Sequence, residues 1–523
     1  MNRSIRSVFS VYRERVRRWP FGALLLGLVF QVAAWILVIP PYSTYDEFDH
    51  VYRASSVWHG QLTGLPDPPA GYPGAVIADR DLVRGGVLEC MGLPYTSTTR
   101  CNVGPPGPDG TVIVTSGAAL YNPLYYVLVS PATAVGHGAD TVLWLRVWSG
   151  LITFAVVGWA LFLASTWSRP DTAVRGVILA ASPMLTISMA VVAPNGLEMA
   201  SGLLWWVGLV SLSRHERPGA RVWIPLVVAG CLLALLRSLG PLFLVVSVVI
   251  MLVWRGPQLR RLWSTSRREL ATALTFVGLS LAISAGWVLT QHFDAFETRP
   301  LFPEADLLKG FWVSVQQSPT VVALFVAAIP ARNLAPPLIV VAAWLIPFVL
   351  LLLNVDRRRR RPMFAMVVLA GFVVTFPLLF GALTFRNFGF AWQSRYILPL
   401  AIGIPLLAAV NGLRIPARVR VNDAVAIACV LIAQLATIRF GQQWYDDHSP
   451  LIRVLHQFPL VDRWVPTLTV VLGVGLTGVA LFAARTGDEC GPETLKVNSG
   501  STSEQVDPGP VSVRPATDST TVP

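Results

Sequence analysis

The sequence predicts an all-α polytopic membrane protein with about twelve transmembrane helices and a long first extracytoplasmic loop. Of its 523 residues, 54% are hydrophobic and only 13% are charged, whereas about a quarter of a soluble chain is charged. Apolar runs recur along the chain, and many are long enough to cross a bilayer. Arginines gather in the short loops between these runs, as the positive-inside rule expects for cytoplasmic loops.

The arginines also predict the orientation. Residues 1–20 contain six arginines, so we expect a basic cytoplasmic N-terminus. The later arginine-rich loops alternate with poorer ones in a way that also places the C-terminus in the cytoplasm. These loops account for the net charge of +12, so we expect the lipid bilayer as a partner and no nucleic acid.

A transmembrane domain is predicted over 21–485, with the first span at 21–39. An extracytoplasmic loop follows at 41–140 and is rich in Gly and Pro, which predicts irregular structure with short helices. Within it, 116–131 is apolar but short and contains Pro123, so we interpret it as an interfacial helix. Residues 486–523 are predicted to be a disordered cytoplasmic tail. The other predicted spans are 141–166, 174–193, 197–213, 221–237, 239–254, 270–290, 335–354, 363–384, 397–413, 423–440 and 465–485.

The five cysteines are too few for a disulfide scaffold. Cys231 and Cys429 lie inside apolar runs and are expected to be packing residues. Cys90 and Cys101 share the loop 41–140, and an oxidising compartment would permit a disulfide between them.

The stretch after the first span is the leading candidate for chemistry. Pro40 and Pro41 end the first helix, because neither has an N–H to donate. Thr44 and Glu47 have capping-box spacing, which predicts that a new helix starts at Thr44. On that helix one face would carry four ionisable residues, Asp46, Asp49, His50 and Arg53.

A purely structural reading of this helix stays open. Acidic residues in a first turn favour the helix dipole, and Glu47 could only complete the capping box. Asp49 and Arg53 have the spacing of an ordinary i,i+4 ion pair.

Three more polar segments meet the same membrane face in this topology. They contain Asn195 and Glu198, Arg237, and the run from Gln393 to Tyr396 with Arg395. Ionisable groups at membrane depth are costly, which makes each a functional candidate. As alternatives, Asn195 and Glu198 could form a capping box, and the two arginines could extend to the headgroups.

Carboxylates and arginines on one membrane face suit an anionic, lipid-linked substrate. Arginine binds phosphate bidentately and stays charged. A carboxylate can act as general base on a hydroxyl or hold a divalent cation. Tyr121 and Trp392 could stack against a sugar, or belong to an interfacial aromatic belt.

The stretch Asp46-Glu47-Phe48-Asp49-His50-Val51-Tyr52-Arg53-Ala54 resembles the signature of DUF2142, a family of bacterial membrane proteins. Tyr121-Asn122-Pro123-Leu124-Tyr125-Tyr126, Ala193-Pro194-Asn195-Gly196-Leu197 and Gln393-Ser394-Arg395-Tyr396-Ile397-Leu398-Pro399 resemble its other blocks, in the same order. That family is similar to GT-C glycosyltransferases, such as protein O-mannosyltransferases and aminoarabinose transferases. Those enzymes have many spans, a long first external loop and an acidic residue after the first span that is the base or a metal-linked carboxylate. One departure is Asn195, which stands where the resemblance leads us to expect aspartate and cannot act as a base.

The resemblance implies a GT-C-like fold and a membrane glycosyltransferase. It would move a sugar from a polyprenyl-phosphate donor to a cell-envelope glycan or lipid, outside a bacterial plasma membrane. Asp46 would be the base, and Glu47 and His50 would support it or hold a divalent cation, although no residue is assigned as a metal ligand. Two alternatives stay open: a transporter or flippase of lipid-linked sugars, and a non-catalytic envelope-assembly protein. The residues expected to bind substrate are Arg53, Arg237, Arg395, Tyr396, Gln393, Glu198 and Asn195.

Overall fold

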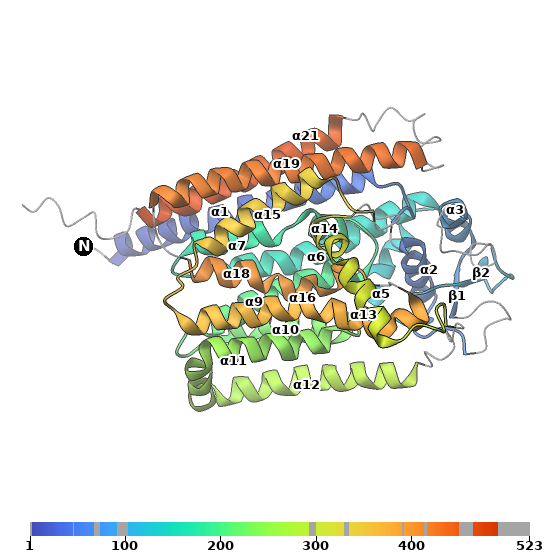
Figure 1. Ribbon diagram of the computed structural model, residues 1–523, viewed down its shortest axis with the longest axis horizontal. Helices are drawn as coiled ribbons and strands as arrows, with labels where there is room; N and C mark the ends of the chain where they lie inside the picture. Colours follow the sequence, from blue (N-terminus) through green and yellow to red (C-terminus); the bar gives the residue numbers. More distant parts are fainter. Residues whose placement is uncertain are drawn as a thin grey trace, which may run out of the picture.

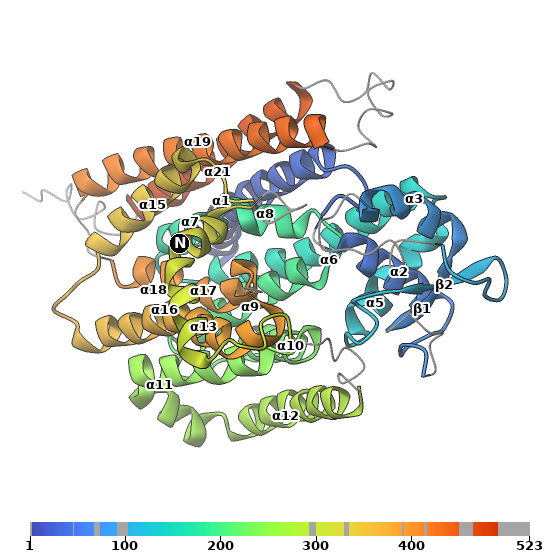
Figure 2. The same cartoon turned by 45° about the vertical axis from the view of Figure 1, so that its right-hand side comes forward.

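The computed structural model describes residues 3–44, 46–66, 74–91, 103–291, 300–328, 334–389, 392–412, 416–448 and 464–489. In these ranges the chain forms a bundle of long helices with a smaller subdomain at one end (Figure 1, Figure 2). We call this smaller part the end subdomain, residues 47–134. The bundle helices are α1 (Arg3–Val38), α6 (Ala139–Ala164), α7 (Pro170–Ala180), α8 (Pro183–Met189), α9 (Pro194–Leu212), α10 (Ala220–Leu236), α11 (Gly240–Thr265), α12 (Arg267–Thr290), α15 (Leu338–Leu353), α16 (Arg360–Phe388), α17 (Leu398–Ala401), α18 (Gly403–Val410), α19 (Pro416–His448) and α21 (Trp464–Glu489).

Each of the predicted spans falls on one or two of these helices. Seven helices in the described ranges are long and apolar enough to cross a membrane, and α7 with α8 would make an eighth. Because α9, α10, α15 and the pair α17 and α18 do not meet that measure, the count of about twelve stays a prediction. The span predicted at 174–193 is not one straight helix, because the chain bends by 76° between α7 and α8. The break follows from Ser182 and Pro183, which cap and begin α8.

The first and last helices pack closely along the bundle, side by side in both views (Figure 1, Figure 2). At their contact, a Cβ added to Gly27 would lie 2.7 Å from the carbonyl oxygen of Gly473. The Gln31 amide also donates to Thr477 Oγ1 at 3.2 Å. Small residues and buried polar bonds are the usual means by which membrane helices associate.

The end subdomain contains a two-stranded sheet, although no strand was predicted there from the sequence. Strands β1 and β2 pair antiparallel, with Ala75 opposite Thr115 and Asp79 opposite Thr111. The prediction of irregular structure with short helices was therefore wrong for these residues. The strands are five residues each and far apart in sequence, so no local turn signal marks the pairing. The elements are α2 (Glu47–Trp58), β1 (Ala75–Asp79), α3 (Arg80–Met91), β2 (Thr111–Thr115), α5 (Leu124–Val129) and the 3₁₀ helix η1 (Ser130–Ala134).

Between α12 and α15 lie two short helices for which no element was predicted, α13 (Leu307–Gln316) and α14 (Ser318–Val326). Asp306 begins α13 by accepting a hydrogen bond from the backbone N–H of Lys309 at 2.7 Å. A second 3₁₀ helix, η3 (Ser394–Ile397), leads directly into α17. The Ser394 hydroxyl donates to the carbonyl oxygen of Val321 at 2.7 Å, which fastens η3 to α14.

Candidate functional site

Asp46 lies in the connection between α1 and the end subdomain. It is the N-cap of α2, with φ 48° and ψ 21° in the left-handed region, and its side chain makes no capping hydrogen bond. The predicted helix start at Thr44 is therefore wrong, and Glu47 does not close a capping box with it. A non-glycine residue in this region is uncommon, although Asp and Asn tolerate it best, and such residues cluster at functional sites.

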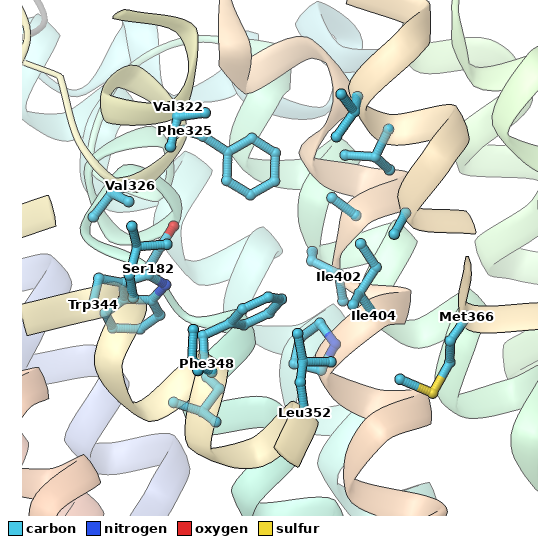
Figure 3. Close-up of a pocket in the computed structure, with 18 of the residues that line it drawn as sticks. Ser182, Val322, Phe325, Val326, Trp344, Phe348, Leu352, Met366, Ile402 and Ile404 are labelled. Carbon is cyan, nitrogen blue, oxygen red and sulfur yellow. The ribbon is translucent and has the colours of Figure 1, made fainter. Parts of the chain in front are cut away.

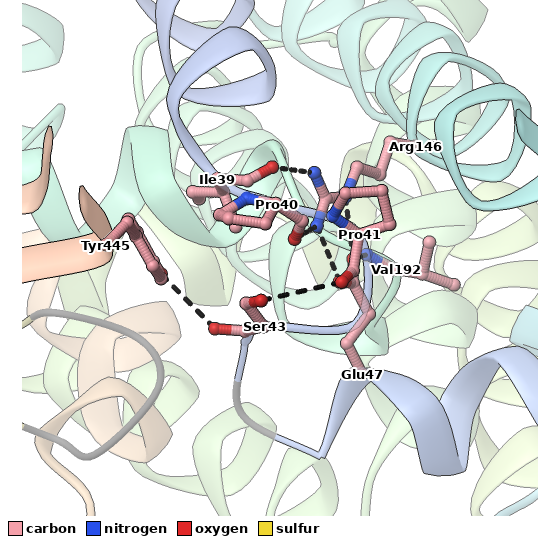
Figure 4. A network of polar contacts seen from close by, with 8 residues as sticks. All are labelled: Ile39, Pro40, Pro41, Ser43, Glu47, Arg146, Val192 and Tyr445. Carbon is pink, nitrogen blue, oxygen red and sulfur yellow. Dashed lines mark hydrogen bonds and ion pairs between the residues drawn. The ribbon is translucent and has the colours of Figure 1, made fainter. Parts of the chain in front are cut away.

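Glu47 is held in a buried ion pair with Arg146 of α6 (Figure 4). Arg146 Nε donates to one carboxylate oxygen at 2.8 Å and Nη2 donates to the other at 2.6 Å. The backbone N–H of Val192 also donates to this carboxylate, at 3.0 Å. Neither charged side chain is more than 1% exposed. Glu47 therefore holds the start of α2, next to Asp46, against α6 and the segment before α9.

Arg146 also completes the end of α1. It donates to the carbonyl oxygens of Ile39 at 2.6 Å and Pro40 at 2.7 Å (Figure 4). The last carbonyls of a helix lack partners within it, and two prolines in succession supply no N–H. One guanidinium therefore joins α1, the start of α2 and α6. Arg146 was not among the predicted site residues. The one signal for it in the sequence is its place inside an apolar run, where a charge is costly.

Asp49 and Arg53 fasten α2 to the surrounding loops. The Asp49 carboxylate accepts from the backbone N–H of Gly117 at 2.8 Å. The Arg53 guanidinium donates to the carbonyl oxygens of Gln61, at 3.1 Å, and Leu62. Arg53 is completely buried, and these bonds keep its charge on the loop that follows α2.

His50 faces an aromatic wall formed by the segment before and within α5. Its Nδ1 lies 2.7 Å from the Tyr126 hydroxyl, and the two rings stack at 6.0 Å between centroids. The Tyr121 ring lies 5.6 Å from the imidazole. Burial, with the positive charges of Arg237 and Arg395, lowers the pKa of His50 to about 3.

Arg237 and Arg395 come from distant segments and meet around Tyr396. The Arg237 guanidinium lies 4.5 Å from the centre of the Tyr396 ring and 5.8 Å from that of Tyr121. The Arg395 guanidinium lies 5.3 Å from the centre of the same Tyr396 ring. All three distances are within the range of cation–π attraction. Arg237 follows α10 and Arg395 belongs to η3, so the bundle brings together two residues that are far apart in sequence.

Asn195 and Glu198 lie on the first turns of α9 and face Arg237. The N-cap of α9 is Ala193, so the alternative in which Asn195 caps the helix is wrong. Its side-chain oxygen instead accepts a hydrogen bond from Arg237. Glu198 is 1% exposed and close enough for its charge to interact with that of Arg237.

Tyr121 links Asp46 to the two arginines. Burial raises the pKa of its phenol, Arg237 and Arg395 lower it, and Asp46 raises it. All three charges therefore act on the hydroxyl of one partly buried tyrosine. The charges of Asp46, Arg237 and Arg395 thus all interact with Tyr121, whereas Glu47 is bound by Arg146 and Arg53 donates to the loop after α2.

An apolar cavity lies among α14, α15, α16 and α18 (Figure 3). Its volume is about 710 Å³. Leu398, which lines it, is separated from Arg395 by only two residues. Labelled side chains in Figure 3 include Phe325 of α14, Trp344 and Phe348 of α15, and Met366 of α16. The lining continues to Arg357, at the far end of α15.

Gln393 and Trp392 form the approach to η3. The Trp392 ring packs edge-on against Phe376 and Phe380 of α16, at 5.7 and 5.2 Å between centroids. The Gln393 side-chain oxygen is buried, with no hydrogen-bond partner among the described residues. Trp392 is thus a packing residue, and Gln393 is an acceptor without a partner next to Arg395.

No group of three metal-binding side chains occurs among the residues that the structure describes. The expected disulfide between Cys90 and Cys101 lies outside the described residues, because Cys101 and the Cys90 side chain are not among them. Within the described part of the chain Cys231 and Cys429 are free thiols.

We expect His50 to make stability depend on pH. An unfolded histidine has a pKa near 6.5, so below about pH 6.5 the unfolded chain binds a proton that the folded chain does not take up until about pH 3. Stability therefore falls as the pH falls, by about 2 kcal/mol between pH 7.5 and 5. Thermal unfolding of wild type and His50→Gln at pH 7.5 and 5 measures this. Equal pH dependence in the two proteins would contradict it.

Comparison with known proteins gives one family and two structures. The model of a family described as "Predicted membrane protein (DUF2142)" matches residues 28–404. No curated protein gives a significant match. ArnT from Cupriavidus metallidurans bound to undecaprenyl phosphate is 13% identical, with a TM-score of 0.45 over 90% of this chain and 77% of that one. Its apo form is 14% identical, with a TM-score of 0.44 and the same coverage.

Proposed function

The chain belongs to the DUF2142 family of predicted membrane proteins, and we propose that it is a GT-C-type glycosyltransferase. It takes a sugar from a polyprenyl-phosphate donor and passes it to a cell-envelope glycan or lipid. The reaction takes place on the extracytoplasmic face of a bacterial plasma membrane, with both termini in the cytoplasm.

One juxtaposition carries the proposal: the charges of Asp46, Arg237 and Arg395 interact with the partly buried Tyr121, and an apolar cavity reaches Leu398, directly after the η3 helix that contains Arg395. A polyprenyl-phosphate sugar has a phosphodiester group, a long apolar chain and a sugar. Two guanidinium groups match the phosphate. The cavity of about 710 Å³ matches the part of the chain next to that phosphate. Asp46 supplies the group that an acceptor hydroxyl requires.

The transfer follows from these positions. Asp46 takes the proton of the acceptor hydroxyl as its oxygen attacks the anomeric carbon of the donor sugar. The bond from that carbon to the phosphate oxygen breaks, and both bonding electrons stay on the polyprenyl phosphate. Arg237 and Arg395 stabilise the charge that develops there. A single displacement of this kind inverts the anomeric configuration.

The neighbouring residues position these groups. Asn195, which cannot take a proton, orients Arg237 through its side-chain oxygen. Glu198 balances part of the Arg237 charge in a buried place. The Tyr396 ring holds Arg237 and Arg395 in place through cation–π contacts. His50 stays neutral at physiological pH and fixes the Tyr126 hydroxyl at the wall of the site.

The direct test is transfer by the full-length protein in lipid nanodiscs. Radiolabelled polyprenyl-phosphate sugars would be supplied one at a time with an envelope extract from a strain lacking the gene. We expect label to move from at least one donor into glycan or lipid. Absence of transfer from every donor, together with an unchanged envelope in the deletion strain, would overturn the proposal.

A flippase of lipid-linked sugars is the second candidate, and one observation favours it. The lining of the cavity includes Ser318, at the start of α14, and follows α15 from Trp344 to Leu353 and on to Arg357 beyond that helix. A lipid chain could slide along such a path. Movement of a fluorescent lipid-linked sugar between the leaflets of proteoliposomes, without any transfer, would favour this function.

Arg395→Gln is expected to weaken donor binding in the transfer assay. Loss of one charge-assisted contact to phosphate costs about 1.5–3 kcal/mol, so the KM for the donor should rise about tenfold or more. Arg386→Gln, on the last turn of α16 and exposed, is the matched control and should leave the KM unchanged. Equal KM values for the two variants would remove Arg395 from the donor site.

A further inference from the structure

At the other end of the bundle, Arg214 interacts with the charges of Arg169 and Arg255, and Arg255 interacts with that of Arg359. Arg169 precedes α7, Arg214 follows α9, Arg255 lies within α11, and Arg359 precedes α16. The α11 helix places Arg255 about 22 Å from its beginning next to Arg237, at 1.5 Å per residue. This cluster is therefore distinct from the candidate site described above.

Two of these arginines lie against tryptophan rings. The Arg214 guanidinium is 4.7 Å from the centre of the Trp167 ring, and that of Arg255 is 4.7 Å from the centre of the Trp254 ring. Trp167 is itself fixed, because its Nε1 donates to Ser211 Oγ at 2.7 Å. The rings hold the guanidinium planes in place without neutralising their charge.

The backbone of α11 changes direction at Arg255. This residue has φ −129° and ψ 26°, outside the helical region, and Pro257 follows two positions later. A proline inside a helix removes a backbone hydrogen bond and bends the chain. Arg255, at this bend, lies close enough to Arg214 for the two charges to interact.

In the part of the chain that the structure describes, no ion pair balances the positive charge of Arg214 and Arg255. No carboxylate among the described residues forms an ion pair with Arg214 or Arg255, since the nearby ion pairs join Asp171 and Asp423 to Arg175 and Asp356 to Arg359. Arg214 Nη1 and Arg255 Nε are buried and have no hydrogen-bond partner in the described part of the chain. Burial, with the charges of Arg255 and Arg169, lowers the pKa of Arg214 to about 10. Buried N–H donors without acceptors are costly, and so are positive charges close together. A bound anion would relieve both costs at Arg214 and Arg255.

We propose that Arg214 and Arg255, flanked by Arg169 and Arg359, bind one phosphate group at the end of the bundle opposite Asp46. Phosphate accepts several hydrogen bonds and fits the planar guanidinium fork. The site lies at the ends of the helices, where the phosphates of lipid headgroups are also found. An anionic phospholipid and a soluble phosphate share this chemistry, and the measurement below separates the two sources.

The test uses the full-length protein in detergent after removal of bound lipid. Native mass spectrometry would follow the binding of phosphatidylglycerol, and thermal unfolding would follow the effect of inorganic phosphate. The charge-removing variant is Arg214→Gln/Arg255→Gln. Arg260→Gln/Arg261→Gln removes the same charge from exposed positions of α11 and is the matched control.

We expect wild type and the control to bind phosphatidylglycerol about equally and the double variant at least about tenfold more weakly. If only the response to inorganic phosphate is lost, the ligand is a soluble phosphate. Should the double variant fail to fold, Arg214→Lys/Arg255→Lys keeps the charge but removes the fork, and we expect it to lose severalfold in affinity. A variant that binds both probes as tightly as the control would overturn the proposal. None of these results depends on sugar transfer.

Discussion

Asp46→Asn is expected to stop sugar transfer while the protein folds and accumulates normally. The amide keeps the shape of the side chain and tolerates the left-handed backbone at this position, but it cannot accept the proton of an acceptor hydroxyl. Loss of a general base lowers rates by about 10²–10⁴. The measurement is transfer in nanodiscs together with envelope glycan analysis of a deletion strain that expresses the variant.

Two further variants make this result specific. Asp140→Asn removes an exposed carboxylate from the first turn of α6 and should leave transfer unchanged. Asp46→Gly also removes the carboxylate, but glycine adopts φ 48° without strain. It should therefore be at least as resistant to thermal unfolding as wild type and equally inactive. If Asp46→Asn leaves the glycan profile and the transfer rate intact at normal protein level, Asp46 is not the base.

Arg146→Met and Glu47→Gln are expected to cause the largest losses of stability. Each leaves the other member of the pair charged and buried, with no more than 1% exposure, and such changes cost about 3–5 kcal/mol. Arg146→Met also deprives the carbonyls of Ile39 and Pro40 of their donors, so it should be the more severe. Thermal unfolding of the purified variants in one detergent would measure the order.

The double variant separates charge from shape. Glu47→Gln/Arg146→Met leaves no uncompensated charge and should recover part of the loss that Arg146→Met causes. Asp356→Asn breaks the pair with Arg359, whose side chain is 63% exposed, and should cost less than about 1 kcal/mol. If Arg146→Met were tolerated as well as Asp356→Asn, the buried pair would not be what holds the Asp46 turn in place.

Much of the architecture was predictable because it follows from local chemistry. The length of an apolar run is set by the thickness of the bilayer, so helices lie over every predicted span, from α1 to α21. The family was likewise visible in the stretch around Asp46. By contrast, the pairing of β1 with β2 and the bend between α7 and α8 depend on contacts that no local pattern encodes.

The candidate site divides in the same way. Residue type and position marked Asp46, Arg237 and Arg395, because ionisable groups near a membrane are costly wherever the chain carries them. The sequence could not tell which contact Glu47 makes: its spacing from Thr44 is that of a capping box, yet in the fold its carboxylate is bound by Arg146.

The sequence alone determined a helical membrane protein of this family and the segments that carry its polar groups, since hydrophobicity and charge act locally along the chain. The tertiary structure decided the partners: Glu47 with Arg146, Asn195 with Arg237, and Asp46 with the two arginines across Tyr121. Burial is the physical reason for this division. A charge removed from water must find a counterpart, and only the packing of distant helices determines which one lies within reach.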